Sequence, residues 1–254
     1  KVPHDPGSSS PVGVPPEPGE LRDSYTTALL YARRFATENW MFSGQLPLTY
    51  NTLNTPYLRV WRANLADAQV MAHRALVNRS IKGHFVRVFA GLGLKAPTGS
   101  RYDTAEHYQG YFELQGTTGS WDIVTNLEAA WRKGNIGVQT ITNYSINTRD
   151  AFGNRYANFF NVNAAAFYLH TFKNQVTRLM PSLGCFVESY NGRFYEGNPL
   201  EGIGGTTMMA TAALGLYGEH LSIRQEIQVP FFERLNGDQL SSHTVFTLDF
   251  AVAF

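Results

Sequence analysis

The last residues of the sequence alternate between apolar and polar side chains without a break. On one face of an extended strand lie Thr244, Phe246, Leu248, Phe250, Val252 and Phe254, and on the other lie Val245, Thr247, Asp249, Ala251 and Ala253. A period of two over this length is typical of a β-strand with one apolar face, whereas a helix would show a period of 3.6. The same alternation recurs over residues 121–132, 136–147 and 221–231. The sequence therefore predicts an all-β fold.

Strand length separates a soluble β-protein from a membrane barrel. Seven more segments show a weaker alternation, namely 24–36, 38–50, 66–77, 82–96, 156–172, 176–190 and 205–217. The total is about eleven strands, many of 12–16 residues, whereas strands of soluble sheets are usually about 5–6 residues long. A tilted membrane strand needs ~9–11 residues in the hydrocarbon alone. We therefore expect a transmembrane, antiparallel, up-and-down β-barrel.

Eleven is an unexpected count, because single-chain bacterial barrels have even strand numbers. We expect about 12 strands, with the twelfth near residues 58–62; the alternative is that a strand upstream is absent or irregular. Residues 1–20 hold six of the twelve prolines and are predicted to be an extended or disordered lead-in. The barrel is predicted to occupy residues 21–254 as one domain.

Aromatic residues recur ten residues apart on the apolar faces. Trp40 and Tyr50 form one such pair, Trp121 and Trp131 another, and Tyr25 and Phe35 a third. Ten residues at ~3.3 Å, tilted by ~40°, span about 25 Å, the height of the apolar band between aromatic girdles. Tryptophan and tyrosine also cap strands in soluble sandwiches, and that alternative stays open.

Connection lengths alternate along the chain. Short turns are expected at 36–39, 133–135, 173–174 and 218–219, and longer connections at 51–65, 97–118, 191–203 and 232–241. Short periplasmic turns with long external loops are typical of barrels in the bacterial outer membrane. A terminal phenylalanine, Phe254, resembles the signal that the barrel assembly machinery reads in such proteins. Expected partners are this machinery, outer-membrane lipids and other envelope proteins.

Composition excludes several other classes. Charged residues make up 16% of the chain, against about a quarter in a typical soluble domain. A net charge of +1 is too balanced for a nucleic-acid-binding protein. A single cysteine excludes an internal disulfide framework and a multi-cysteine metal site.

Two glycine-rich motifs suggest a family. Residues 91–99 (GLGLKAPTG) are similar to the "GLxLPTG" strand end of a family of outer-membrane barrels, and residues 116–122 (GTTGSWD) to the "PGTGSxD" that opens its next strand. Weaker similarities to the same family occur at Leu65-Ala66-Asp67, at Gly204-Gly205 and at residues 228–230. The sequence departs from the family at Gln115, where proline is usual, and at Leu65-Ala66, where glycine is usual.

The family is often named the MetA-pathway phenol-degradation or transporter-like group. The resemblance covers roughly residues 24–254. It implies an outer-membrane barrel that passes small compounds, often aromatic or hydrophobic ones.

The polar phase of the strands predicts the residues that line the lumen. These are Asp67, Arg87, Lys95, Asp122, Glu128, Arg132, Arg178, Glu188, Arg224, Glu226 and Asp249. Five are basic and six acidic, so no strong preference for anions or cations is expected. Six of them (Glu128, Arg132, Arg178, Glu188, Arg224 and Glu226) are expected to form one ladder of mixed charge. Opposite charges can also pair across a narrow barrel and brace it.

Rings are also predicted to point inward, at Phe85, Phe89, Phe159, Phe167 and Phe186. They would either form a path for ring-shaped solutes or simply fill a small barrel.

No catalytic site is predicted. Barrel phospholipases carry a histidine two residues before the serine, and the one such pair, His220 and Ser222, lies beside a predicted periplasmic turn. The histidines show no metal-ligand spacing, and we expect neither a metal nor a cofactor. The predicted function is passive transport of small solutes, hydrophobic or aromatic ones included. The alternative is a closed structural barrel that serves as an anchor or subunit of an envelope complex.

Overall fold

Every regular element of the described chain is a β-strand. The computed structural model describes residues 22–54, 59–99, 117–151, 153–195, 198–237 and 241–253. Its strands are β1 (Arg22–Phe35), β2 (Trp40–Asn54), β3 (Arg59–Leu65), β4 (Ala68–Ile81), β5 (His84–Ala96), β6 (Asp122–Lys133), β7 (Ile136–Ile146), β8 (Phe159–Tyr168), β9 (His170–Thr171), β10 (Arg178–Tyr195), β11 (Asn198–Tyr217), β12 (Leu221–Leu235) and β13 (Val245–Val252). The expected lead-in at 1–20 and the terminal Phe254 lie outside the described residues.

All the strands belong to one antiparallel sheet, in the order β1-β2-β4-β5-β6-β7-β8-β10-β11-β12-β13. Strands β3 and β4 both pair with β2, and β8 and β9 both pair with β10. Each of these two pairs is thus one strand interrupted by a break, at residues 66–67 and at Leu169. Strand β3 covers part of the segment expected to be a twelfth strand. It is a continuation of β4, however, so it is not counted as a separate strand in the sheet order. The described path therefore has eleven strands.

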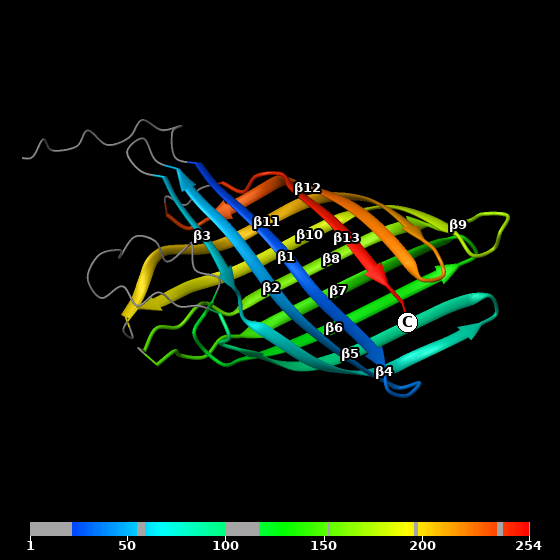
Figure 1. The fold of residues 1–254 in the computed structure, drawn as a ribbon, viewed down its shortest axis with the longest axis horizontal. Coiled ribbons are helices and arrows are strands. Elements are labelled where there is room, and N and C mark those ends of the chain that lie inside the picture. The colour runs from blue at the N-terminus through cyan, green and yellow to red at the C-terminus, as the bar shows by residue number, and fades with distance from the viewer. Residues whose placement is uncertain are drawn as a thin grey trace, which may run out of the picture.

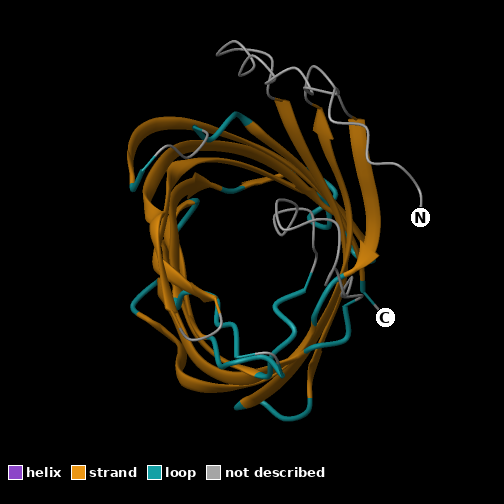
Figure 2. Ribbon diagram, turned by 90° about the vertical axis from the view of Figure 1, so that its left-hand side faces the viewer, coloured by secondary structure: helices purple, strands orange, loops and turns teal. Residues whose placement is uncertain are grey.

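The sheet curls into a barrel, so that its first and last strands come round beside each other (Figures 1 and 2). Because ten antiparallel steps separate β1 from β13, these two edge strands run in the same direction. Within the described residues, no backbone ladder joins them.

Several strands are longer than their apolar alternation indicates. The hairpin of β10 and β11 spans 18 and 20 residues, and β2 continues to Asn54. The expected long connection at 191–203 is therefore wrong, because most of it is paired strand. The connection at 51–65 is wrong for the same reason, since β3 occupies its second half. These extensions mix polar, apolar, glycine and proline residues (59–65 is RVWRANL and 198–204 is NPLEGIG), so no continuous apolar face indicates them.

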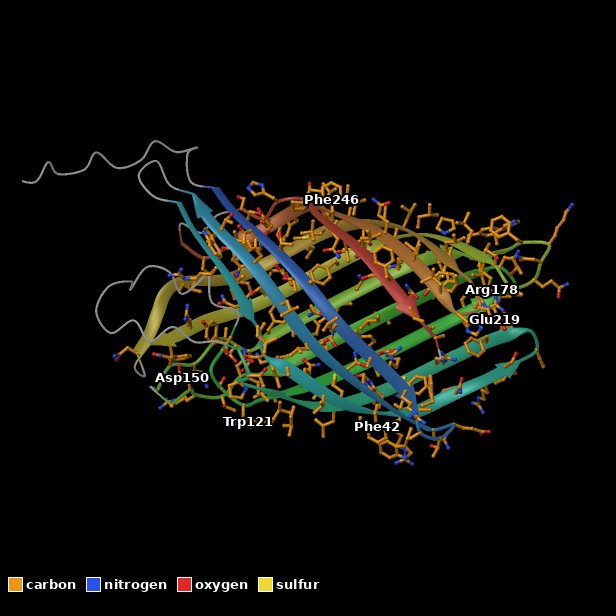
Figure 3. All side chains as sticks on the ribbon, viewed as in Figure 1. Phe42, Trp121, Asp150, Arg178, Glu219 and Phe246 are labelled. Carbon is orange, nitrogen blue, oxygen red and sulfur yellow. The ribbon has the colours of Figure 1, made fainter. Side chains whose placement is uncertain are left out.

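Side chains divide between a concave and a convex face of the sheet. The most buried apolar side chains, including Met41, Met71, Phe89, Val124 and Met209, share the concave face. The convex face carries large exposed apolar side chains, of which Leu183 and Phe246 are each 71% exposed. Figure 3 shows Phe246 on this outer side of β13. The sheet is therefore apolar on the outside, and its polar side chains gather within.

The predicted phase of β1 is wrong. Tyr25 and Phe35 were expected on the outer apolar face, but Phe35 packs edge-on against Phe89, with ring centroids 6.1 Å apart. Phe89 is 1% exposed and lies on the concave face, so the odd-numbered residues of β1 face inward. Apolar residues occur on both faces of this strand, because Leu30 on the even face is also exposed. Alternation alone therefore could not fix the phase.

Candidate functional site

Two buried aspartates organise one end of the concave face. Asp122 begins β6 and is 0% exposed, and Asp67 lies in the break between β3 and β4 with 6% exposure. Lys95 of β5 pairs directly with Asp122 in the strand register, and its Nζ lies 2.6 Å from Asp122 Oδ2. Because a buried charge is costly unless it is paired and hydrogen-bonded, each carboxylate needs several donors.

Threonine and serine hydroxyls supply those donors. Thr118 Oγ1 donates to Asp67 Oδ2 at 2.9 Å and lies 3.0 Å from Asp122 Oδ2, so it sits between the two carboxylates. Ser120 Oγ donates to Asp122 Oδ1 at 2.8 Å, and the Thr148 amide donates to the same oxygen at 2.9 Å. The two aspartates thus form one connected network.

The two glycine-rich motifs meet at this network. Gly99 closes the first motif, and its amide lies 3.3 Å from Asp67 Oδ1, the oxygen to which Thr117 of the second motif donates. A Cβ at Gly99 would lie 2.6 Å from Thr117 Cβ and 2.8 Å from the Leu65 carbonyl, so only glycine fits there. The motifs therefore fasten the two ends of the β5–β6 connection to one buried carboxylate.

An interior cavity of about 480 Å³ adjoins this network. Its lining comes from β1, β2, β5 and β10 and from the segments beside them, and comprises Tyr25, Thr27, Gln45, Pro47, Thr49, Asn51, Ala66, Asp67, Lys95, Thr117, Thr118, Tyr156 and Arg193. Tyr156 and Arg193 contact each other, with Arg193 Nη2 donating to the Tyr156 hydroxyl at 2.9 Å. The volume lies within the range of small-molecule sites, and most of the lining residues carry a polar group beside their apolar surface.

A row of polar side chains crosses the concave face from β4 to β8. The register places His73, Gly91, Asn126, Asn143 and Asn161 side by side. Asn126 donates to Asn143 Oδ1 and Asn143 to Asn161 Oδ1, each at 2.9 Å. Such amide contacts between neighbouring strands stabilise the sheet.

His73 is 2% exposed and continues this row into β2. Its Nε2 lies 2.9 Å from Ser43 Oγ. The Nδ1 of His73 and the Oδ1 of Asn126 are both buried, and neither has a hydrogen-bond partner among the described residues; they lie on either side of Gly91.

The remaining interior charges form two further groups. Glu128 pairs with Arg33 of β1, and Arg87 lies over the rings of Phe85 and Phe89, with its Cζ 5.4 and 5.7 Å from their centroids. On the far side of the sheet, Arg224 pairs with Glu226 and with Asp249, the latter at 3.3 Å. The pair of Arg33 with Glu128 crosses the concave face between β1 and β6, four places apart in the sheet, whereas the Arg224 group stays on β12 and its neighbour β13.

The register places the eleven predicted lumen residues on the concave side of the sheet, but it does not gather them. The six residues expected to form one ladder are dispersed: Arg178 and Glu188 lie ten residues apart on β10, about 33 Å along the strand. Arg132 donates to the carbonyl of Gly134 in its own hairpin turn. That the eleven line a path for solutes stays a prediction.

The four predicted girdle residues, Trp40, Tyr50, Trp121 and Trp131, are all exposed. Tyr50 stacks on Trp61 of β3, with centroids 6.0 Å apart. Their place at the membrane boundaries stays a prediction. The five inward phenylalanines share the concave register, and Phe159 packs on Tyr190 at 6.5 Å.

Sequence reasoning missed several residues of this interior. Arg33 was missed because the phase of β1 was misread, and Ser43 and His73 because only the spacing of a serine two residues after a histidine was considered. Asn126, Asn143 and Asn161 have the inward phase of their strands, but only charged residues were predicted to line the lumen. Thr117 and Thr118 were part of a recognised motif, but their hydrogen bonds to Asp67 could be identified only from the folded structure.

No group of three potential ligands among the described histidines, cysteines, aspartates and glutamates could hold a metal ion. None of the described residues belongs to a helix long and apolar enough to span a membrane.

Comparisons with known proteins support the fold. No protein-family model matches the chain, and no curated protein matches it. Among solved structures, the chain is similar to the COG4313 outer membrane channel from Pseudomonas putida F1, with a TM-score of 0.62 and 12% sequence identity over 91% of this chain and 83% of that one. At this identity the likeness shows the fold, an outer-membrane type of β-barrel. It gives no support to the narrower MetA-pathway resemblance.

Proposed function

We propose that this protein is a bacterial outer-membrane β-barrel that conducts small solutes passively. The interior cavity beside Asp67 and Lys95 carries the proposal, because it is of solute size, combines polar groups with apolar surface and is lined from several strands. The convex face supports it, since exposed apolar side chains such as Leu183 and Phe246 would face lipid. The similarity to a solved outer membrane channel agrees with this reading.

The interior chemistry favours solutes that carry both a ring and polar groups. Tyr25 and Tyr156 present rings at the cavity, while Thr27 and Thr49 present hydroxyls. The five basic and six acidic residues predicted to line the lumen nearly balance, so strong selection by charge is not expected. Small hydroxylated or aromatic compounds fit this surface.

A hydrolytic function is not proposed, although Ser43 and His73 are in hydrogen-bond contact. Ser43 lies in the middle of β2, paired to β1 at Arg33 and to β4 at Met71. The backbone N–H groups around it are committed to the sheet, so none is placed to stabilise an oxyanion.

The closed structural barrel remains the second candidate. The braced carboxylates Asp67 and Asp122 favour a rigid wall, which either function would need. Recognition of Phe254 by the assembly machinery also stays a prediction, since that residue lies outside the described part of the chain.

Swelling of proteoliposomes tests the proposal. Vesicles that contain the purified protein should swell in a monosaccharide or in hydroxybenzoate, and swell little in a hexasaccharide. Thr27→Trp should reduce the swelling, because this side chain lines the cavity. Thr26→Trp on the opposite face of β1 is the matched control and should leave it unchanged. A folded barrel that gives no swelling above empty vesicles would support the closed barrel instead.

A further inference from the structure

A second cavity lies on the convex face, across β1, β2, β4 and β5. It has a volume of about 610 Å³. Small residues Ala32, Gly44 and Ala72 form its floor: Ala32 pairs with Gly44, and Ala72 lies diagonally across β4, where it pairs with Phe42. Exposed apolar side chains form its walls, and these are Phe42, Val70, Leu92 and Leu94.

The floor is open above Gly44. A Cβ at this position would meet only the Gln69 carbonyl oxygen, at 3.9 Å. A groove of this depth and apolar lining fits a hydrocarbon chain better than a polar solute. Figure 3 shows Phe42 projecting from the outside of the wall near the end of β1.

Two arginines on the same convex face flank the groove. Arg34 lines it and pairs in register with Phe42. Arg74 of β4 pairs with Trp40, two residues before Phe42, and its Cζ lies 5.9 Å from the centroid of the Trp40 ring. Two strand spacings and an offset of two residues separate the backbones of the arginines, about 12 Å. Within the described residues neither makes an ion pair, and the exposed Glu38 of the adjacent turn makes none either.

An unpaired charge on the outside of a barrel is costly unless it lies at an interface. For arginine the cost is about 2–4 kcal/mol at the midplane and falls to about 0–1 near the headgroups. Arg34 lies at the end of β1, two residues before the turn at 36–39, and the nearby Trp40 is a typical interfacial residue. A phosphate at this depth would complement both guanidinium groups.

We propose that this groove binds an anionic phospholipid, with its phosphate between Arg34 and Arg74 and one acyl chain over Gly44. The inference rests on the proposed membrane location. The short turn at 36–39 belongs to the side that is periplasmic in barrels of this type, so the lipid comes from the inner leaflet and is a phospholipid, not lipopolysaccharide.

Native mass spectrometry of the detergent-purified protein tests the proposal. Phosphatidylglycerol, phosphatidylcholine and lipopolysaccharide are titrated separately, and phosphatidylglycerol should bind tightest. The double variant R34Q/R74Q should weaken its binding about tenfold or more, an effect that corresponds to about 1.4 kcal/mol. G44L should weaken binding of both phospholipids, because its side chain fills the floor.

Matched controls use the same changes elsewhere on the convex face. Arg79→Gln removes an exposed arginine outside the groove, and Ala164→Leu adds a large side chain on β8; neither should change binding. Equal binding of the two phospholipids, tighter binding of lipopolysaccharide, or wild-type binding by R34Q/R74Q would overturn the proposal.

The failure of the lipid site can be distinguished from failure of the proposed function. Each preparation is also tested for the heat-modifiable folded form and for proteoliposome swelling. A folded, conducting barrel that retains no phosphatidylglycerol overturns the lipid site alone. A protein that stays soluble without detergent overturns both.

Discussion

Asp122 shows how a charge can be placed in the wall of this barrel. It is 0% exposed, yet Lys95, Thr118, Ser120 and Thr148 all contact its carboxylate. The polar phase of the sequence predicted Asp122 and Lys95 as interior residues, and the register makes them direct neighbours. The contact between Arg33 and Glu128 joins residues 95 positions apart, and no local pattern could have predicted it.

Replacing Asp122 should be far more damaging than replacing an exposed interior acid. Asp122→Ala leaves the Lys95 charge and three donors without their acceptor, and breaking a buried pair in this way costs about 3–5 kcal/mol of unfolding free energy. Asp249→Ala is the control, because its side chain is 51% exposed and Arg224 keeps Glu226, so its cost should stay under about 1 kcal/mol. Urea unfolding in lipid vesicles, followed by tryptophan fluorescence, measures both. Equal losses would contradict the assigned role of Asp122.

Strands differ in how clearly their sequence marks an inner and an outer face. In β12 and β13 the polar and apolar sets are separate, so the strands and their phase were predicted. In β1 both faces are apolar, and the phase was settled only by long-range contacts such as that of Phe35 with Phe89. In β10 and β11 the ends that meet at the connection mix polar, apolar and glycine residues, so alternation could not show how far the hairpin extends.

The asparagine row ties the three consecutive strands β6, β7 and β8 together, and Asn143 is its central member. Asn143→Ala removes both hydrogen bonds of this residue within the row, to Asn126 and to Asn161, and should lower the unfolding free energy by about 1–3 kcal/mol. Gln139→Ala, four residues away on the same face of β7, should cost less because the row does not include it. Urea unfolding compares the two, and an equal effect would show that the row adds nothing to the wall.

At the scale of the whole molecule, the two edge strands of the described sheet are not joined by backbone hydrogen bonds. Its edge strands β1 and β13 run in the same direction, and an unpaired edge cannot face hydrocarbon without a cost of several kcal/mol per backbone group. The eleven counted strands were predicted from the alternation, whereas the even total of twelve was inferred from the parity of known barrels. Whether the number of strands is even depends on how the whole barrel closes, so the sequence of a single strand could not predict it.

The central claim is that this cylinder spans a membrane and conducts. Single-channel recording of the purified protein in a planar lipid bilayer tests it most directly. We expect discrete conductance steps, with a reversal potential near zero under a salt gradient because the five basic and six acidic residues predicted to line the lumen nearly balance. A heat-modifiable, folded protein that inserts but gives no steps above the bare bilayer would contradict it.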